Sequence, residues 1–133
     1  MNVLSYKTLS KCEDTGTRNE DVFMADRRGS ECSKFIVADG ATTGFSGGRF
    51  AYAVAWSFMS TPQNTTWRKR LKLAWERFDS QVDYRKLKWF QRRNYERGSF
   101  STMLTGEVVR GGILLTAVGD TCAFVVDKCS LAI

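Results

Sequence analysis

The sequence contains no histidine, and this absence removes whole classes of chemistry. Neither a Ser-His-Asp nor a Cys-His catalytic arrangement can form within the chain. The four cysteines, Cys12, Cys32, Cys122 and Cys129, include no C-x-x-C pair, so a zinc site is not expected either. We interpret them as free and mostly buried thiols. Any hydrolytic reaction in this chain would therefore depend on carboxylates and a metal ion.

Long hydrophobic runs are also missing. No apolar stretch approaches the roughly 20 residues that span a bilayer, and the segment from Met1 to Leu9 has no signal-peptide pattern. We therefore expect a cytoplasmic protein without a membrane partner. The composition, 43% hydrophobic and 26% charged, is typical of a globular protein, and the length fits one domain over residues 1–133.

The pattern of apolar residues predicts strands near the beginning and the end of the chain. The expected strands cover residues 3–9, 22–26, 35–38, 100–109, 113–118 and 122–126. Gly29 marks a turn over residues 27–33, and Gly111-Gly112 is typical of a hairpin turn. The last three strands would then form a meander.

Two helices are expected between these groups of strands. The first has the i, i+3, i+4, i+7 spacing of an amphipathic helix at Ala51, Val54, Ala55 and Phe58. Pro62 would end it, and a second helix would begin near Asn64 as its N-cap. The predicted apolar face of this second helix consists of Trp67, Leu71, Trp75, Phe78 and Val82. Residues 84–97 either extend this helix or form a loop. The order of elements predicts an α+β fold with helices packed on an antiparallel sheet.

Two carboxylate motifs fall at the ends of predicted strands. Arg18-Asn19-Glu20-Asp21 enters one strand, and Val37-Ala38-Asp39-Gly40 leaves another. Carboxylates at strand ends can converge on one edge of a sheet, and Mg²⁺ and Mn²⁺ prefer such oxygen ligands. Gly40 would let the backbone approach closely enough for its carbonyl to coordinate. Taken singly, each motif is equally typical of an ordinary turn or loop tip.

The combination with two later motifs changes this interpretation. Gly98-Ser99-Phe100-Ser101-Thr102 and Val118-Gly119-Asp120-Thr121 follow in order. Together the four segments resemble the metal-dependent serine/threonine protein phosphatases of type 2C, the PPM family. The form Asp39-Gly40-Ala41-Thr42 resembles a bacterial branch of that family. The resemblance extends over about residues 9–127, nearly the whole chain.

The resemblance implies a partial α/β/β/α antiparallel sandwich and a phosphoserine or phosphothreonine protein as substrate. In such enzymes the aspartate matching Asp39 bridges two Mn²⁺ or Mg²⁺ ions, and the carbonyl matching Gly40 binds one of them. Glu20 and Asp21 match positions that hold that ion directly or through water. Asp120 matches a position that helps hold a third, weaker metal ion in some members. A bridging water, activated as hydroxide, attacks the phosphorus in line, and no histidine is needed as the nucleophile.

Two departures from the family pattern bear on activity. The arginine that many members place before the Asn-Glu-Asp group, where it binds the substrate phosphate, is Gly16 here, and Arg18 is the candidate to replace it. The later metal aspartates of the family, in D-G/A and D-N/D segments, are missing. We therefore expect a truncated type 2C phosphatase-like domain that is weakly active or inactive as this chain.

Three explanations of the missing segments stay open at this point. The chain is a fragment or truncated reading frame of an enzyme, a catalytically dead regulatory or phosphoprotein-binding module, or one part of an assembly in which another chain supplies ligands. An open strand edge near residues 124–126 would also allow self-association.

The net charge of +6 is concentrated in one segment. Residues 67–97 contain 11 Lys or Arg against 4 Asp or Glu, a charge of +7, and the remainder of the chain carries −1. Basic residues interleaved with aromatic ones can bind single-stranded nucleic acid, which is a minor alternative function. A solvated helix face is the simpler interpretation. A basic face near the site would also favour acidic phosphoprotein substrates.

Overall fold

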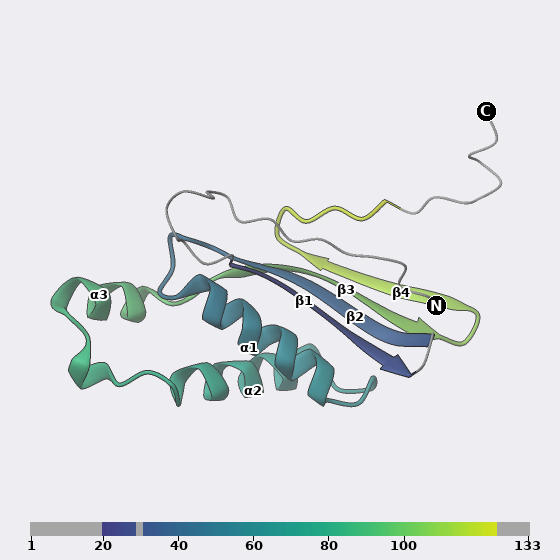
Figure 1. Cartoon of the computed structure of the whole chain (residues 1–133), viewed down its shortest axis with the longest axis horizontal. Helices are drawn as coiled ribbons and strands as arrows, with labels where there is room; N and C mark the ends of the chain where they lie inside the picture. Colours follow the sequence, from purple (N-terminus) through teal and green to yellow (C-terminus); the bar gives the residue numbers. More distant parts are fainter. Residues whose placement is uncertain (1–19, 29–30, 125–133) are drawn as a thin grey trace.

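A computed structural model describes residues 20–28 and 31–124 of the chain (Figure 1). The elements in this part are β1 (Asp21–Arg28), β2 (Glu31–Gly40), α1 (Gly47–Ser60), α2 (Trp67–Asp79), the 3-10 helix η1 (Tyr84–Lys86), α3 (Trp89–Arg97), β3 (Ser101–Val109) and β4 (Gly112–Val118). The strands form one antiparallel sheet in the order β1-β2-β3-β4. The predicted α+β class is therefore confirmed.

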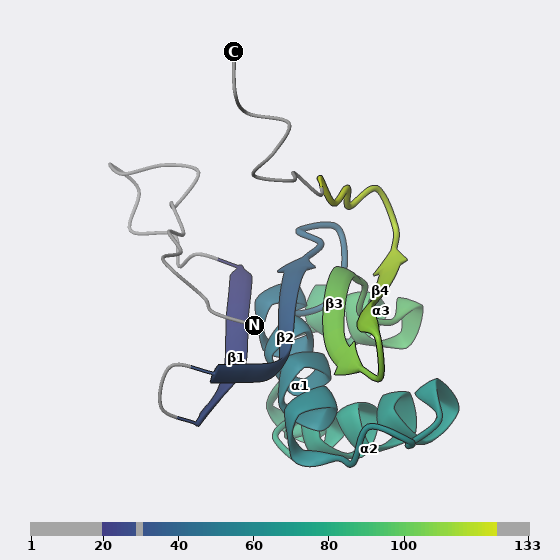
Figure 2. The same ribbon diagram turned by 90° about the vertical axis from the view of Figure 1, so that its right-hand side faces the viewer.

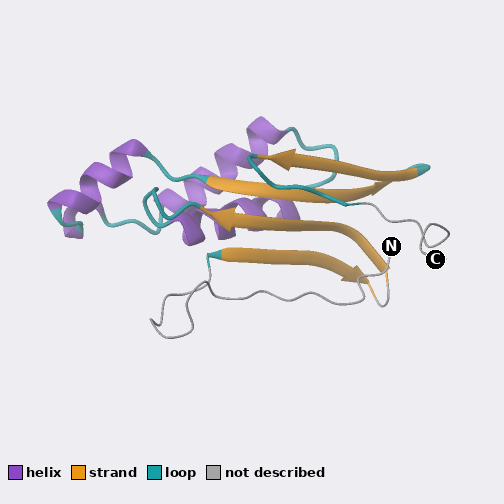
Figure 3. Ribbon diagram, turned by 90° about the horizontal axis from the view of Figure 1, so that it is seen from above, coloured by secondary structure: helices purple, strands orange, loops and turns teal. Residues whose placement is uncertain are grey.

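The helices that pack on the sheet lie on one side of it. α1 runs along the face formed by β1 and β2, and α2 packs against α1 on the side away from the strands (Figures 1 and 2). Seen from above, the four strands lie side by side in front of the helices (Figure 3). A second sheet on the opposite face, which an α/β/β/α sandwich requires, is not among the described residues, so that architecture stays a prediction.

The core lies between α1 and the inward residues of the sheet. Every residue of the predicted α1 apolar face is buried, as are alternate residues of β2 and four residues of β3, of which Met103 is the hydrophobic side chain that joins this core. The buried hydrophobic set that joins these elements is Ile36, Ala38, Ala51, Ala53, Val54, Ala55, Phe58, Ala74, Phe78 and Met103. The local spacing of apolar residues therefore identified this helix and its inner face correctly.

The turn predicted over residues 27–33 is wrong for residues 27, 28 and 31–33, which belong to β1 and β2, while residues 29 and 30 lie outside the described part. The β1–β2 ladder continues through the pairs Arg27↔Cys32 and Arg28↔Glu31, because backbone pairing across a β-bulge near Ala25 does not require apolar side chains. Cys32 is buried there, whereas Cys122 is exposed, so the expectation of mostly buried thiols holds for one of the two described cysteines.

The strand expected at residues 122–126 is not formed over its described part, Cys122–Phe124. The side chain of Phe124 is 90% exposed, so this short apolar run has no surface against which to bury. Its remaining residues, 125 and 126, lie outside the described part, as does the strand expected at residues 3–9.

The second helix begins later and faces a different way than the sequence predicts. Thr66 is its N-cap and accepts a hydrogen bond from the Lys69 amide, while a turn from Pro62 precedes it. Leu71 and Trp75 are 45% and 39% exposed, although both were assigned to the apolar face. The buried residues of α2 are Arg70, Ala74 and Phe78. The prediction was wrong for Leu71 and Trp75, because an arginine occupies the central position of the buried face. Phe78 is buried as predicted, and Trp67 and Val82 pack against the core.

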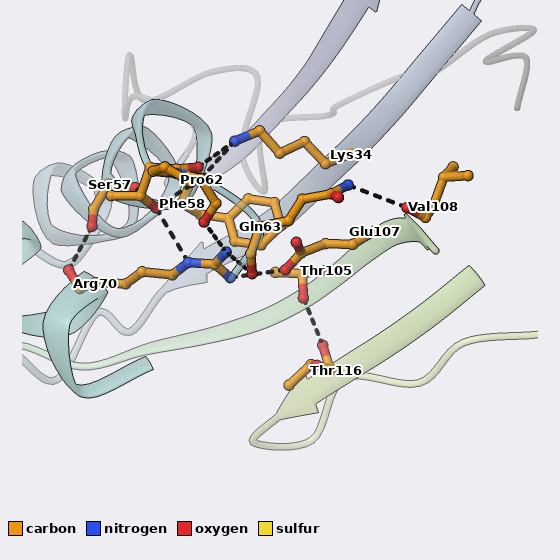
Figure 4. A network of polar contacts seen from close by, with 11 residues as sticks. Lys34, Ser57, Phe58, Pro62, Gln63, Arg70, Thr105, Glu107, Val108 and Thr116 are labelled. Atoms are coloured by element: carbon orange, nitrogen blue, oxygen red, sulfur yellow. Dashed lines mark hydrogen bonds and ion pairs between the residues drawn. The ribbon is translucent and has the colours of Figure 1, made fainter. Parts of the chain in front are cut away.

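Arg70 is buried at 2% exposure and joins three parts of the chain (Figure 4). Its guanidinium donates to Glu107 Oε1 on β3 at 2.8 Å, to the carbonyls of Pro62 and Gln63, and to the Thr61 hydroxyl. It also lies over the Phe58 ring, 4.7 Å from the ring centre. This saturation of donors explains how a charge is accommodated in the core.

Lys34 is a second buried cation, and it caps the C-terminus of α1 by donating to backbone carbonyls. Its ammonium donates to the carbonyl of Phe58 at 3.1 Å and to that of Thr61 at 2.7 Å, which are acceptors left unpaired at the C-terminus of the helix (Figure 4). Burial, together with the nearby Arg70 guanidinium, lowers the pKa of Lys34 below its usual value. The side chain therefore has a structural role.

Candidate metal site

The two aspartates of the first motifs lie opposite each other in the sheet. Asp21 is the first residue of β1, Asp39 is next to last in β2, and the register pairs them directly. Directly opposed residues in an antiparallel pair share a face, with Cβ atoms about 4.5–5.5 Å apart. The fold therefore brings these two carboxylates side by side on the face that points away from α1.

One oxygen of this pair stands out. Asp39 Oδ1 is buried and has no hydrogen-bond partner among the described residues. A buried carboxylate oxygen without a donor is costly, and a second carboxylate directly opposite adds repulsion. A bound cation would relieve both costs. Because all the donor atoms are carboxylate oxygens, the pair fits a hard divalent ion such as Mn²⁺ or Mg²⁺.

Glu20 lies differently from its two companions. Its backbone carbonyl accepts a hydrogen bond from the Gly40 amide at 3.3 Å. Its side chain turns to the α1 side of the sheet, where a Cβ added to Gly48 would lie 3.4 Å from Glu20 Cγ. The face of the sheet thus separates the Glu20 carboxylate from Asp21 and Asp39.

This placement offers Glu20 a structural role. α1 has no acidic residue in its first turn, and among the described residues no side-chain hydrogen bond caps its N-terminus at Ser46. A carboxylate near the positive end of a helix dipole stabilises that end. The Glu20 stem lies beside Gly48 in the first turn of α1, where a carboxylate would stabilise the positive end of the helix dipole.

Gly40 and Gly47 are required by close backbone packing. A Cβ added to Gly40 would overlap the backbone of Gly47, and one added to Gly47 would overlap that of Ala41. The end of β2 therefore presses directly on the first turn of α1, a contact that only glycine permits. The coordinating role that the resemblance gives to the Gly40 carbonyl stays a prediction.

The two later motifs reach the same end of the sheet. Thr102 on β3 is the register partner of Asp39, and Gly119, at φ 90°, packs so closely that an added Cβ would lie 2.7 Å from Thr102 Cγ2. Asp120 follows Gly119 in an exposed bend after β4. The described parts of all four motifs therefore lie at the same end of the sheet. The sequence gives no indication that Thr102 is a neighbour of Asp39, because only the strand register places the two residues opposite each other.

The described part of the chain contains no group of three or more Asp, Glu, Cys or His side chains placed to hold a metal ion. The carboxylates that converge here are the pair Asp21 and Asp39. Arg18, the candidate phosphate-binding residue, lies outside the described residues. A site formed by this pair would leave most of an ion's coordination to water.

A surface hollow lies at the opposite end of the sheet. Ala25, Asp26 and Lys34 line it together with residues 59–62 at the C-terminus of α1. Since the lysine there is engaged by helix carbonyls, we assign the hollow no part in the metal site.

Comparisons with known proteins identify no relative. No protein-family model matches the chain, and neither the curated proteins nor the solved structures contain a significant match. Separately, none of the helices in the described part has the length and apolar character needed to cross a bilayer.

Proposed function

We propose that this chain carries the first part of a type 2C phosphatase domain, a Mn²⁺- or Mg²⁺-dependent phosphoserine and phosphothreonine protein phosphatase. The observation that supports this most is the buried Asp39 Oδ1, which has no hydrogen-bond partner in the described part of the chain, with Asp21 directly opposite. The four motifs follow the order seen in the family and lie at one end of the sheet, which also supports this proposal. Under this proposal the sheet and helices are half of the family's α/β/β/α sandwich.

The residues have distinct roles in this proposal. Asp21 and Asp39 would hold the ion, Glu20 would stabilise the start of α1, and Gly40 closes the strand end onto that helix. Asp120 is exposed at the same end of the sheet, after β4, two strands away from the strand that carries Asp39, and would be available to a further ion. When bound, the ion would supply an activated water and neutralise phosphate charge. The protein's own contribution is to fix two carboxylates on a rigid sheet.

The expected activity of the chain is low. A two-metal centre requires more carboxylates than this pair, and we propose that the chain binds one ion weakly and hydrolyses phosphate esters slowly. The alternative is a catalytically dead module that regulates or binds phosphoproteins. Such a module would keep the fold. Metal binding without any hydrolysis of phosphate esters would distinguish it from a weakly active enzyme.

Titration of the chain with Mn²⁺, followed by the loss of the free-ion electron paramagnetic resonance signal, tests the site. We expect one site with a dissociation constant on the order of 10⁻⁴–10⁻³ M, since few protein ligands and water complete the shell. Hydrolysis of p-nitrophenyl phosphate is measured in parallel. Absence of binding at 10 mM Mn²⁺ would remove the metal site, and fast manganese-dependent turnover would show that the centre is complete.

Self-association through the edge of the sheet is a separate expectation. β4 is the last strand of the described sheet, and it exposes Ile113, Leu114, Leu115 and Val118. A long apolar edge strand favours pairing with another chain. We predict concentration-dependent oligomers in light scattering after size exclusion, and a shift toward monomer for Leu114→Lys. A wild-type chain that stays monomeric up to 1 mM would contradict this prediction.

A cytoplasmic location remains part of the proposal.

Nucleic-acid binding by residues 67–97 is the weaker alternative, because the rings of Trp67, Trp75 and Tyr95 are all packed against other rings within the protein. They are therefore not available as a platform on which bases could stack.

A further inference from the structure

α3 projects from the end of the sheet that carries Asp21 and Asp39 (Figure 1). Immediately after it, the Gly98 carbonyl accepts a hydrogen bond from the Phe45 amide at 3.2 Å, and the Phe100 carbonyl accepts one from the Ala41 amide at 3.0 Å. These bonds join the C-terminal end of α3 to the loop that follows β2. The C-terminal end of α3 is therefore anchored at the end of the sheet that carries the aspartate pair.

One face of α3 holds the helix in place. The Tyr95 ring packs edge-on against Phe45 at 5.4 Å between ring centres, and its hydroxyl donates to Asp79. Arg92 donates to the Leu87 carbonyl at 3.0 Å and lies over the Tyr84 ring. Gln91, Arg92 and Tyr95 are the partly buried residues of the helix. These contacts fix the rotation of α3 about its axis.

The opposite face, which we call the α3 outer face, consists of Trp89, Phe90, Arg93 and Arg97. At 3.6 residues per turn these four side chains fall within an arc of about 100°. Trp89 is 76% exposed and Phe90 46% exposed, and their rings contact each other at 5.9 Å between centres. Exposed tryptophan beside arginine is the composition of binding hot spots. This arrangement is not needed for packing, since none of the residues of α3 is buried.

The charge of this region indicates the chemistry of its partner. Residues 84–97 contain six Lys or Arg against the single acidic residue Glu96. Lys86 is paired with Asp83 at 3.2 Å, whereas Arg93 and Arg97 form no ion pair with any described residue. An acidic partner complements this surface and would be steered toward it.

We propose that the α3 outer face docks an acidic segment of a phosphoprotein substrate, with the Trp89–Phe90 pair receiving an apolar side chain of that segment. This inference rests on the proposed phosphatase function, since it is the adjacent metal site that would take the phosphorylated residue. A nucleic acid fits less well. It would bring its phosphates toward Asp21, Asp39 and Glu20, and it would find one pair of rings in edge-to-face contact instead of a row.

The test measures binding of a fluorescein-labelled phosphoserine peptide to the full chain by fluorescence anisotropy at about 0.1 M salt, where the Debye length is about 10 Å. The peptide carries glutamates and one leucine, and a matched peptide replaces the glutamates by glutamines. We expect the double variant Arg93→Glu/Arg97→Glu, and separately Trp89→Ala, to raise the dissociation constant by about tenfold or more. The glutamine peptide should bind wild type about tenfold more weakly. Circular dichroism checks that the variants are folded.

The control is Arg110→Glu, the same substitution made once and half the charge change of the double variant, in the exposed turn between β3 and β4 at the far end of the sheet (Figure 1). It should change the dissociation constant by less than about twofold, because charges beyond a Debye length are screened. Equal binding of both peptides, or wild-type binding by the double variant, would overturn the docking proposal.

Two further measurements separate this inference from the phosphatase proposal. Asp39→Asn should still bind the acidic peptide through α3. A chain that binds the peptide but does not bind Mn²⁺ would support the docking proposal and contradict the metal-site proposal. Conversely, if the chain binds Mn²⁺ but the α3 variants leave the dissociation constant of the peptide unchanged, only the docking proposal is contradicted. An oligo-dT that binds more tightly than the peptide and is lost in the same double variant would overturn the assignment to an acidic protein segment.

Discussion

Asp39→Asn should abolish the thermal stabilisation that Mn²⁺ gives to the chain. A ligand that binds only the folded state stabilises it by about 1.4 kcal/mol at a concentration ten times its dissociation constant. For a domain of this size that corresponds to a rise of several degrees in the unfolding midpoint. The substitution removes the negative charge of the carboxylate that we expect to contact the ion and replaces one of its oxygens by an amide nitrogen, so the midpoint should no longer respond to Mn²⁺.

Without metal, the same substitution should act in the other direction. Like charges directly opposed in a sheet destabilise it by about 0.2–1 kcal/mol, and the amide removes one charge of the Asp21–Asp39 pair. The variant should therefore equal or exceed wild type in metal-free buffer. A substitution that merely damaged the fold would lower stability under both conditions, so the change of sign identifies a metal role.

Asp26→Asn is the matched control for this experiment. It makes the same chemical change on β1, near the opposite end of the sheet, where Asp26 accepts a hydrogen bond from Ser33. This variant should keep the full Mn²⁺ response, measured by thermal denaturation with and without 10 mM MnCl₂. A full response in Asp39→Asn would mean that the ion binds elsewhere.

Arg70→Ala should destabilise the protein by about 3–5 kcal/mol, the range seen when one partner of a buried ion pair is removed. Glu107 would remain as a buried charge without its partner at 2.8 Å. The carbonyls of Pro62 and Gln63 and the Thr61 hydroxyl would lose their donor at the same time. Urea denaturation followed by circular dichroism measures the free energy of unfolding.

Two further variants separate the charge from the contacts. Arg68→Ala, an exposed position on the same helix, should change the stability by less than about 0.5 kcal/mol. The double variant Arg70→Met/Glu107→Leu should recover much of the loss, because apolar replacement of a buried pair is often neutral or stabilising. An Arg70→Ala protein within about 1 kcal/mol of wild type would show that this network is not a major source of stability.

The contrast between α1 and α2 shows how far periodicity reaches. The apolar spacing of α1 matched its buried face, since the helix lies against a sheet of apolar residues. In α2 the same reasoning chose Leu71 and Trp75, whereas the buried position belongs to Arg70. A hydropathy pattern places a charged residue such as Arg70 on the solvent-exposed face of a helix. Arg70 can be buried because Glu107 on β3 pairs with it.

The candidate site divides in a similar way. Motif order alone predicted that Asp21 and Asp39 would converge, but their direct opposition depends on a strand register set by the whole β1–β2 ladder. The position of Glu20 was not predictable. A residue next to Asp21 points to the other face of the sheet, and only the packing of α1 against that face shows what it meets.

For this protein, the sequence by itself determined the class of fold, the amphipathic face of α1, and the order of four motifs that place carboxylates at strand ends. These are local properties, which depend on residues close together in the chain. The tertiary structure decided the burial of Arg70, the separation of Glu20 from the aspartate pair, and the exposure of the α3 outer face. Each of these depends on contacts between residues distant in sequence, such as Arg70 with Glu107, which no local pattern encodes.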